Sequence, residues 1–232
     1  MKQLLTEQAA WLAPARARLL RRVAIAHRQR VLDLGAGPGA VTPELVRRSG
    51  GLVVALDVDL DALQTNGDWQ EAVRVAANGR FLPFAPQTFD LVFCQCVLMW
   101  IDGLATAVSQ IRRVLTDDGV LVALEPDYGG MMEHPPALAT QTLWLNALRR
   151  AGADPLVGRK LPGLLHAHGF DVRVSLFDTL TAPEDGRFAL LRSLNLTPDE
   201  EAQLQAIEQQ TAHATYPIAH LPFFLIEAAC RA

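Results

Sequence analysis

The sequence predicts an α/β protein in which helices cover both faces of a mostly parallel sheet. Short apolar runs alternate with helical patterns between residues 30 and 125, which is typical of strand–helix–strand units. A glycine-rich turn joins the first of these runs directly to a helical segment, as in doubly wound sheets. The chain has 232 residues, half of them hydrophobic, so it can bury one sizeable core, and we expect a single domain.

Charge and composition exclude several function classes. The net charge of −4 offers no global attraction for nucleic acid. Three cysteines without a disulfide framework favour a reducing compartment. The polar start of the chain lacks the apolar region of a signal peptide, and no apolar run is long enough to span a membrane. We therefore expect a cytoplasmic protein. Six arginines near the start are interpreted as the solvated face of a helix: Arg16, Arg18, Arg21, Arg22, Arg28 and Arg30.

The first 28 residues predict two short helices separated at Pro14, because proline disrupts a helix interior. Leu12, Ala15, Leu19 and Val23 form one apolar stripe at helical spacing. We expect this helical leader to lie over the ligand-binding edge of the sheet.

Five strands are then predicted, each short and rich in apolar residues. The intervening segments favour a helix over 40–49, a weak helix after Asp57 and a helix over 104–115. Two glycines, Gly50 and Gly51, end the first of these helices. The predicted strands are 31–34, 52–56, 73–77, 89–96 and 119–125.

The last hundred residues predict helices over 136–151 and 159–168, followed by two more strands. Apolar and polar residues alternate over 170–176, which is typical of an edge strand. The final strand, 223–226, is apolar on both faces, so we expect it to insert between the fifth strand and this edge strand. Two capping boxes, Thr181–Glu184 and Thr197–Glu200, predict two helices before it.

Three polar features recur at the ends of successive predicted strands, the edge at which open α/β sheets bind ligands. The first is the turn Gly35-Ala36-Gly37-Pro38-Gly39. The second is Asp57, whose carboxylate can accept two hydrogen bonds from a ribose diol. The third is Asn78-Gly79, whose amide can meet the edge of an adenine. In this order they indicate an adenosine-containing ligand.

The glycine spacing narrows the choice of ligand. Gly35-x-Gly37-x-Gly39 differs from the Gly-x-Gly-x-x-Gly pattern of dinucleotide-binding proteins. Asp33, inside the first strand, is costly to bury without a partner, and a cationic amino or sulfonium group would compensate it. These features favour an adenosyl ligand without a pyrophosphate and disfavour a nicotinamide-dependent oxidoreductase.

These residues and the segments around them resemble the motifs of a known family. Residues 31–42 resemble motif I of the class I S-adenosylmethionine-dependent methyltransferases, and Asp57 matches the acidic residue after their second strand. Residues 78–93 and 111–119 resemble two later blocks of the same family. The resemblance covers residues 30–127 and is closest to the small-molecule branch, similar to ubiquinone/menaquinone-biosynthesis-type domains.

The resemblance implies a Rossmann-like sheet of seven strands with an antiparallel last strand, N-terminal helices and a helical insertion before that strand. It also implies one domain, 1–232, with a helical leader (1–28), a cofactor-binding core (30–127) and an acceptor side (128–232). The implied activity is methyl transfer from S-adenosylmethionine to a small-molecule acceptor, with no metal ligands. The implied cofactor-binding residues are Asp33, Gly35, Ala36, Gly37, Gly39, Asp57, Val58, Asn78, Gly79, Cys94 and Gln95.

Within that set, Asp33 would face the amino group of the cofactor and Asp57 its ribose hydroxyls. Val58 would lie against the adenine, and Asn78 would accept from its amino group. The backbone at Cys94 and Gln95 would border the methionine portion. Asn78 departs from the family, which usually carries Asp there; its amide oxygen can still accept, so we expect weaker binding.

No catalytic signature is expected, because methyl transfer needs a base only when the acceptor must lose a proton. His134, Tyr128 and Trp100, in the loops after the fourth and fifth strands, are candidates for contacting the acceptor. Each also has a structural interpretation: a surface-loop histidine, a tyrosine that caps its loop and a core aromatic. Further candidates at this edge are Glu125, Asp127 and Glu133. A non-catalytic cofactor-binding partner protein stays open as an alternative, as do the acceptor and the oligomeric state.

Overall fold

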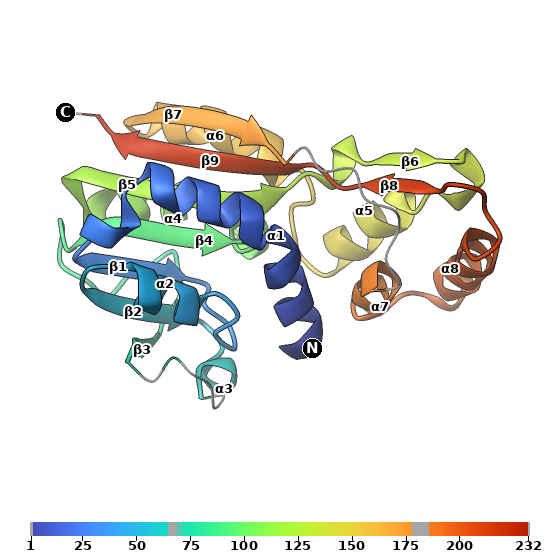
Figure 1. Ribbon diagram of the computed structural model, residues 1–232, viewed down its shortest axis with the longest axis horizontal. Coiled ribbons are helices and arrows are strands. Elements are labelled where there is room, and N and C mark those ends of the chain that lie inside the picture. The colour runs from blue at the N-terminus through green and yellow to red at the C-terminus, as the bar shows by residue number, and fades with distance from the viewer. Residues whose placement is uncertain (1, 65–68, 70, 178–185, 232) are drawn as a thin grey trace.

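The computed structural model describes residues 2–64, 69, 71–177 and 186–231. Its centre is a seven-stranded sheet in the order β3-β2-β1-β4-β5-β9-β7 (Figure 1). Strands β3, β2, β1, β4 and β5 run parallel, and β9 is antiparallel to both of its neighbours. The predicted fold class is therefore confirmed, including the insertion of the last strand. The strands are β1 (Arg30–Leu34), β2 (Leu52–Asp57), β3 (Val73–Ala76), β4 (Phe89–Gln95), β5 (Leu115–Pro126), β7 (Phe170–Leu176) and β9 (Phe223–Cys230).

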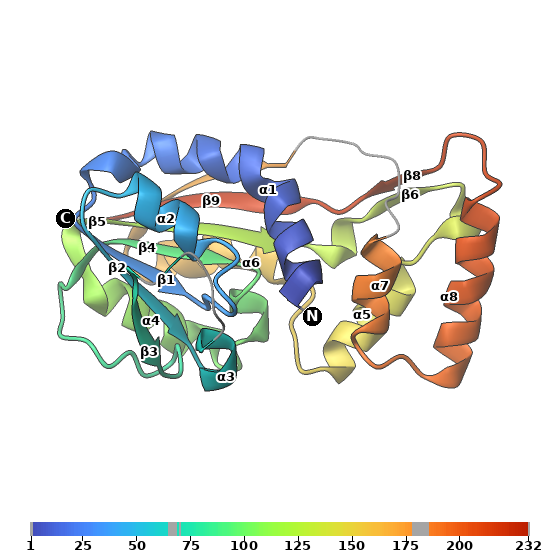
Figure 2. The same ribbon diagram turned by 60° about the horizontal axis from the view of Figure 1, so that its bottom comes forward.

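Helices cover both faces of the sheet because its central strands are apolar on both sides. Along β1, Val31 packs into one core and Leu32 into the other. Helices α1 (Lys2–Arg22) and α2 (Thr42–Arg48) lie on one face, and α4 (Leu104–Val114) and α6 (Val157–Ala167) lie on the opposite face (Figure 2). Helix α3 (Leu60–Leu63) follows β2.

Helix α1 continues through Pro14, so the prediction of two helices separated there is wrong. The helix changes direction midway along its length (Figure 1). Proline removes one helical hydrogen bond, but Leu12, Ala15 and Leu19 are buried on both sides of it. Burial of that stripe against the sheet outweighs the lost hydrogen bond, and a short helix, η1 (Ile25–His27), leads into β1.

The second half of the chain adds a helical group beyond the carboxyl end of β5 (Figures 1 and 2). It contains α5 (Gln141–Arg150), α7 (Gly186–Arg192) and α8 (Pro198–Thr211). The capping box at Thr197 is present as predicted, whereas the one at Thr181–Glu184 lies outside the described residues. The short helices η2 (Leu98–Trp100), η3 (Tyr128–Gly130) and η4 (Pro136–Leu138) shape the loops, so the helix predicted from 136 begins only at Gln141.

A two-stranded sheet in this group was not predicted. Strands β6 (Met132–His134) and β8 (Ile218–His220) pair antiparallel across more than eighty residues of sequence. Three-residue strands are too short to show an alternating pattern, so the sequence carries no signal for them.

None of the helices in the described parts of the chain has the length and apolar character needed to cross a membrane.

Candidate functional site

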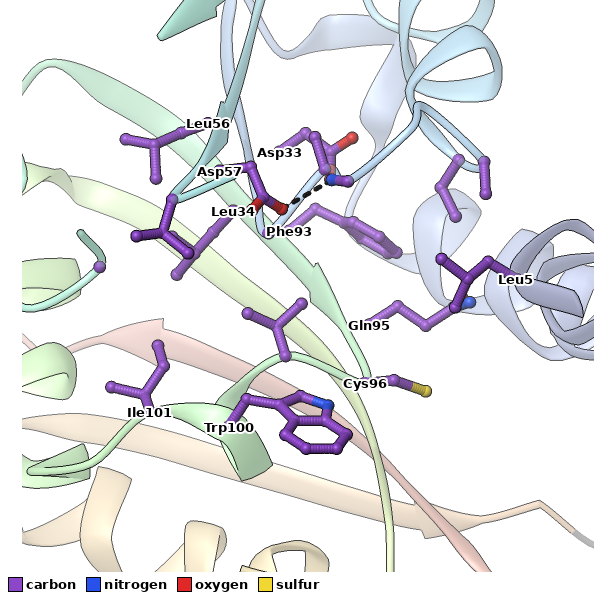
Figure 3. A pocket seen from close by; sticks show the side chains of 18 of the residues that line it. Leu5, Asp33, Leu34, Leu56, Asp57, Phe93, Gln95, Cys96, Trp100 and Ile101 are labelled. Atoms are coloured by element: carbon purple, nitrogen blue, oxygen red, sulfur yellow. Dashed lines mark hydrogen bonds between the residues drawn. The ribbon is translucent and has the colours of Figure 1, made fainter. Parts of the chain in front are cut away.

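A cavity of about 520 Å³ opens at the carboxyl end of the parallel strands. Its walls come from α1, from the glycine turn after β1 and from the ends of β2, β3 and β4 (Figure 3). This volume falls within the range of small-molecule and cofactor sites.

The three glycines of the turn all have positive φ, but they serve different purposes. A Cβ on Gly35 would lie 2.3 Å from Val97, and one on Gly39 would lie 2.5 Å from the ring of Trp69. At Gly37, the nearest atom to a Cβ would be Oδ2 of Asp57, 4.0 Å away. The outer glycines therefore permit close packing, whereas the central one leaves an open cradle beside a carboxylate.

Asp57, the last residue of β2, faces this cradle. Its Oδ2 accepts a hydrogen bond from the Gly37 N–H at 2.7 Å (Figure 3). Its Oδ1 accepts one from the Asp59 N–H at 2.9 Å. A carboxylate has about four acceptor positions, so lone pairs remain for hydroxyl groups of a ligand.

Asp33, the last but one residue of β1, lines the cavity and is 3% exposed. Burial raises the pKa of its carboxyl to about 7, although the Thr42 hydroxyl donates to it at 2.7 Å and the guanidinium of Arg16 lowers the pKa. A cation in the cavity would stabilise the charged form of this carboxyl.

The end of β3 supplies Asn78 and Gly79, which both line the cavity. The Asn78 Oδ1 accepts a hydrogen bond from the Arg80 N–H at 2.9 Å, which fixes the amide in the turn. Val58, which also lines the cavity, is 73% exposed and so offers an apolar surface to a ligand.

The end of β4 contributes Gln95 and Cys96 to the cavity, whereas Cys94 is fully buried and is not among the lining residues. Cys96 has a positive φ of 57°, so the chain leaves the strand there and the thiol turns toward α1 (Figure 3). Burial raises the pKa of the Cys96 thiol, which therefore stays protonated at neutral pH.

Arg16 is a buried residue next to the cavity whose contacts the sequence analysis missed. Its side chain is 5% exposed, and it forms an ion pair with Glu44 at 2.7 Å. Its Nη1 donates to the Ala9 carbonyl at 2.8 Å and to Oε1 of Gln95 at 2.9 Å. The interpretation as a solvated face is wrong for this residue. A signal was present, because Arg16 follows Leu12 by four positions and so lies on the apolar stripe.

The three candidates for contacting the acceptor have different positions. Trp100 lines the cavity and is 45% exposed. Tyr128 is buried, with its ring centroid 4.9 Å from that of Trp144, and is not a lining residue. His134 lies exposed on β6 and is also not a lining residue. Of these three candidates, Trp100 alone lines the cavity together with the predicted cofactor-binding residues.

The acidic residues near this edge bind parts of the chain itself. Glu125 is fully buried and accepts from the Val97 and Leu98 N–H groups at 3.0 and 2.9 Å. Burial raises its pKa to about 7, against the effect of these hydrogen bonds. Asp127 forms an ion pair with Arg159 at 2.6 Å, and Glu133 accepts from the Thr140 hydroxyl at 2.7 Å. Across the described residues, no group of His, Cys, Asp and Glu is arranged to hold a metal ion.

The sequence is similar to a known family model and to several curated proteins. Residues 32–123 match the family model described as a methyltransferase domain. A demethylmenaquinone methyltransferase of Corynebacterium urealyticum is 36% identical over 110 residues, 47% of each chain. The human mitochondrial arginine-hydroxylase NDUFAF5 is 29% identical over 169 residues, which are 70% of this chain and 48% of that protein. The chain thus spans about half the length of these two curated relatives.

Solved structures agree with the fold. A Bacillus halodurans protein described as a candidate methyltransferase superposes with a TM-score of 0.70 over 93% of this chain and 98% of that chain, at 18% identity.

Proposed function

Since the chain belongs to the class I S-adenosylmethionine-dependent methyltransferases, we propose that it transfers a methyl group from S-adenosylmethionine to a small-molecule acceptor. The observation that carries this proposal is the open cradle at Gly37 beside the Asp57 carboxylate, at the ligand-binding edge of the sheet. The proposal takes residues 1–232 as one unit, in which 30–127 hold the cofactor and the flanking segments enclose the acceptor.

The residues that line the cavity fit the chemistry of this cofactor. Asp57 would accept hydrogen bonds from the ribose hydroxyls, with Val58 and Asn78 at the adenine. Asp33 would face the ammonium group, because a buried carboxyl whose pKa is raised to about 7 gains from a neighbouring cation. Gly35 and Gly37 would let the backbone approach the amino-acid portion closely.

When bound, S-adenosylmethionine would supply an electrophilic methyl group on a sulfonium, whose sulfur would keep the electron pair as the leaving group. The chain contributes positioning and exclusion of water. The cavity is also lined by Trp100 and by the N-terminal half of α1, which supplies Leu5 and Gln8. Neither His134 nor Tyr128 lines the cavity, so neither would take a proton from the acceptor.

Isothermal titration calorimetry with S-adenosylmethionine, S-adenosylhomocysteine and NAD tests the proposal. We expect both adenosyl compounds to bind and NAD to give no binding heat. Binding of NAD without binding of either adenosyl compound would instead support an oxidoreductase.

A further inference from the structure

Gln95 has an orientation that the surrounding chain dictates. Arginine has donors only, and Nη1 of Arg16 lies 2.9 Å from Oε1 of Gln95. The oxygen of the amide must therefore face Arg16, and its NH₂ group must point elsewhere. No hydrogen bond from this NH₂ group to the described residues is found, while Gln95 lines the cavity.

Arg16 is itself held firmly, so the amide cannot easily rotate. The guanidinium is anchored by Glu44 through Nε at 2.8 Å and Nη2 at 2.7 Å, and by the Ala9 carbonyl. The charge of Arg16 is thereby neutralised, and the cation is not offered to a ligand. Its role is to position the donor of Gln95.

Three uncharged side chains share one side of the cavity with Gln95; the charge of Arg16 is neutralised by Glu44, and Arg16 does not line the cavity. Leu5, Cys96 and Trp100 lie with Gln95 on the side of the cavity away from Asp57 (Figure 3). The thiol is protonated, because burial raises the pKa of Cys96. An anionic acceptor would lose its hydration here without gaining a cation, and a cationic acceptor would meet a donor instead of an acceptor.

We infer that the side chain of Gln95, whose backbone the family resemblance assigns to the methionine portion of the cofactor, recognises the methyl acceptor. This acceptor is a neutral molecule with a hydrogen-bond-accepting oxygen, and Arg16 orients the Gln95 amide toward it. This inference rests on the proposed function, since it assigns the acceptor part of the same cavity. Trp100 supplies the apolar surface for the carbon skeleton, and the NH₂ group of Gln95 supplies the polar contact.

Three small probes of matched shape test the inference by NMR titration of the protein saturated with S-adenosylhomocysteine. Acetophenone is neutral and only accepts hydrogen bonds, benzoate is an anion, and benzylammonium is a cation that only donates. We expect acetophenone to bind most tightly. Tighter binding of either charged probe, or no binding of acetophenone, would overturn the inference.

A second test replaces the hydrogen-bond donor of Gln95 with an acceptor. In Gln95→Glu the NH₂ donor is replaced by a carboxylate oxygen, so acetophenone should bind about 2- to 12-fold more weakly, which is the value of one hydrogen bond. Gln209→Glu makes the same change of charge at an exposed residue of α8 outside the cavity, and it should leave acetophenone binding within about twofold. Equal losses in the two variants would contradict the role of Gln95.

The affinity ratio of two probes tests whether Arg16 positions the Gln95 amide. In Arg16→Met the amide is free to flip, so the affinity ratio of acetophenone to benzylammonium should fall, and Arg16→Lys, which keeps a donor, should restore part of it. An unchanged ratio in Arg16→Met would remove Arg16 from this role. Binding of S-adenosylhomocysteine to the wild type, measured first, separates the two proposals. If it does not bind, the proposed function fails; if it binds and the probes do not follow the expected order, the inference about the acceptor fails. The variants are compared at saturating S-adenosylhomocysteine.

Discussion

The Asp57 carboxylate accepts a hydrogen bond from the backbone N–H of Gly37 at 2.7 Å. This contact joins the end of β2 to the glycine turn after β1 and fixes the shape of the cradle before any ligand arrives. Asp59 N–H donates to the other oxygen, so the carboxylate is held from two sides. A ligand with two adjacent hydroxyl groups would therefore meet an acceptor that needs little reorganisation.

Alanine at two of the glycines should separate ligand binding from folding. Gly37→Ala adds a methyl group in open space, so we expect a loss of stability of about 1–2 kcal/mol from the positive φ alone. The same methyl group narrows the cradle and should weaken S-adenosylhomocysteine binding. Urea unfolding and calorimetry measure the two effects.

Gly39→Ala is the matched comparison. Its Cβ would lie 2.5 Å from the Trp69 ring, so this variant should be less stable than Gly37→Ala. Gly37→Ala with wild-type affinity for S-adenosylhomocysteine would show that the cradle is not the binding site.

The Asp33 carboxyl should make stability depend on pH. Its pKa is raised by burial from the ordinary value of 3.8 to about 7, so the protonated form is favoured in the folded state. The contribution of this carboxyl to the free energy of unfolding is fully present below its pKa in the unfolded chain, 3.8. It is lost as the pH rises through about 7, its pKa in the folded protein. Wild type should therefore lose stability relative to Asp33→Asn between these values, by at most about 1.4 kcal/mol per pH unit. Urea unfolding of both proteins at pH 5 and pH 8 measures this, and a constant difference would contradict it.

Glu125 should stabilise the loop that forms one wall of the cavity. Glu125→Ala leaves the Val97 and Leu98 N–H groups without their acceptor, and the loss should be about 1–3 kcal/mol. Glu125→Gln keeps an acceptor oxygen, so its stability should lie between those of wild type and the alanine variant. Thermal unfolding with matched buffers compares the three, and equal losses in both variants would count against the capping role.

The sheet was predictable because the pattern of apolar residues along each strand indicates its position in the sheet. The run that became β9 is apolar on both faces, which requires an interior position, and β7 alternates, which suits an edge. Asp57 and Asn78 were placed at one edge because parallel strands present their carboxyl ends together. The helical continuity through Pro14 was not predictable, since burial of the flanking stripe decides it.

The remaining features of the site depend on contacts between distant segments. Arg16 meets Glu44 and Gln95 only after α1 packs on the sheet, so its spacing indicates burial but not its partners. Cys96 lines the cavity at a point where the chain has a positive φ, and the pattern of a strand does not predict such a turn. Tyr128 lies away from the cavity because its ring packs on Trp144.

The most direct test is the dissociation constant of S-adenosylhomocysteine for Asp57→Ala, measured by calorimetry. Hydrogen bonds to a charged group contribute roughly 1.5–3 kcal/mol each, so the affinity should fall at least about tenfold. Asp61→Ala removes a nearby exposed carboxylate outside the cavity and should bind as wild type does. An unchanged dissociation constant in a folded Asp57→Ala protein would contradict the assignment of the ribose site.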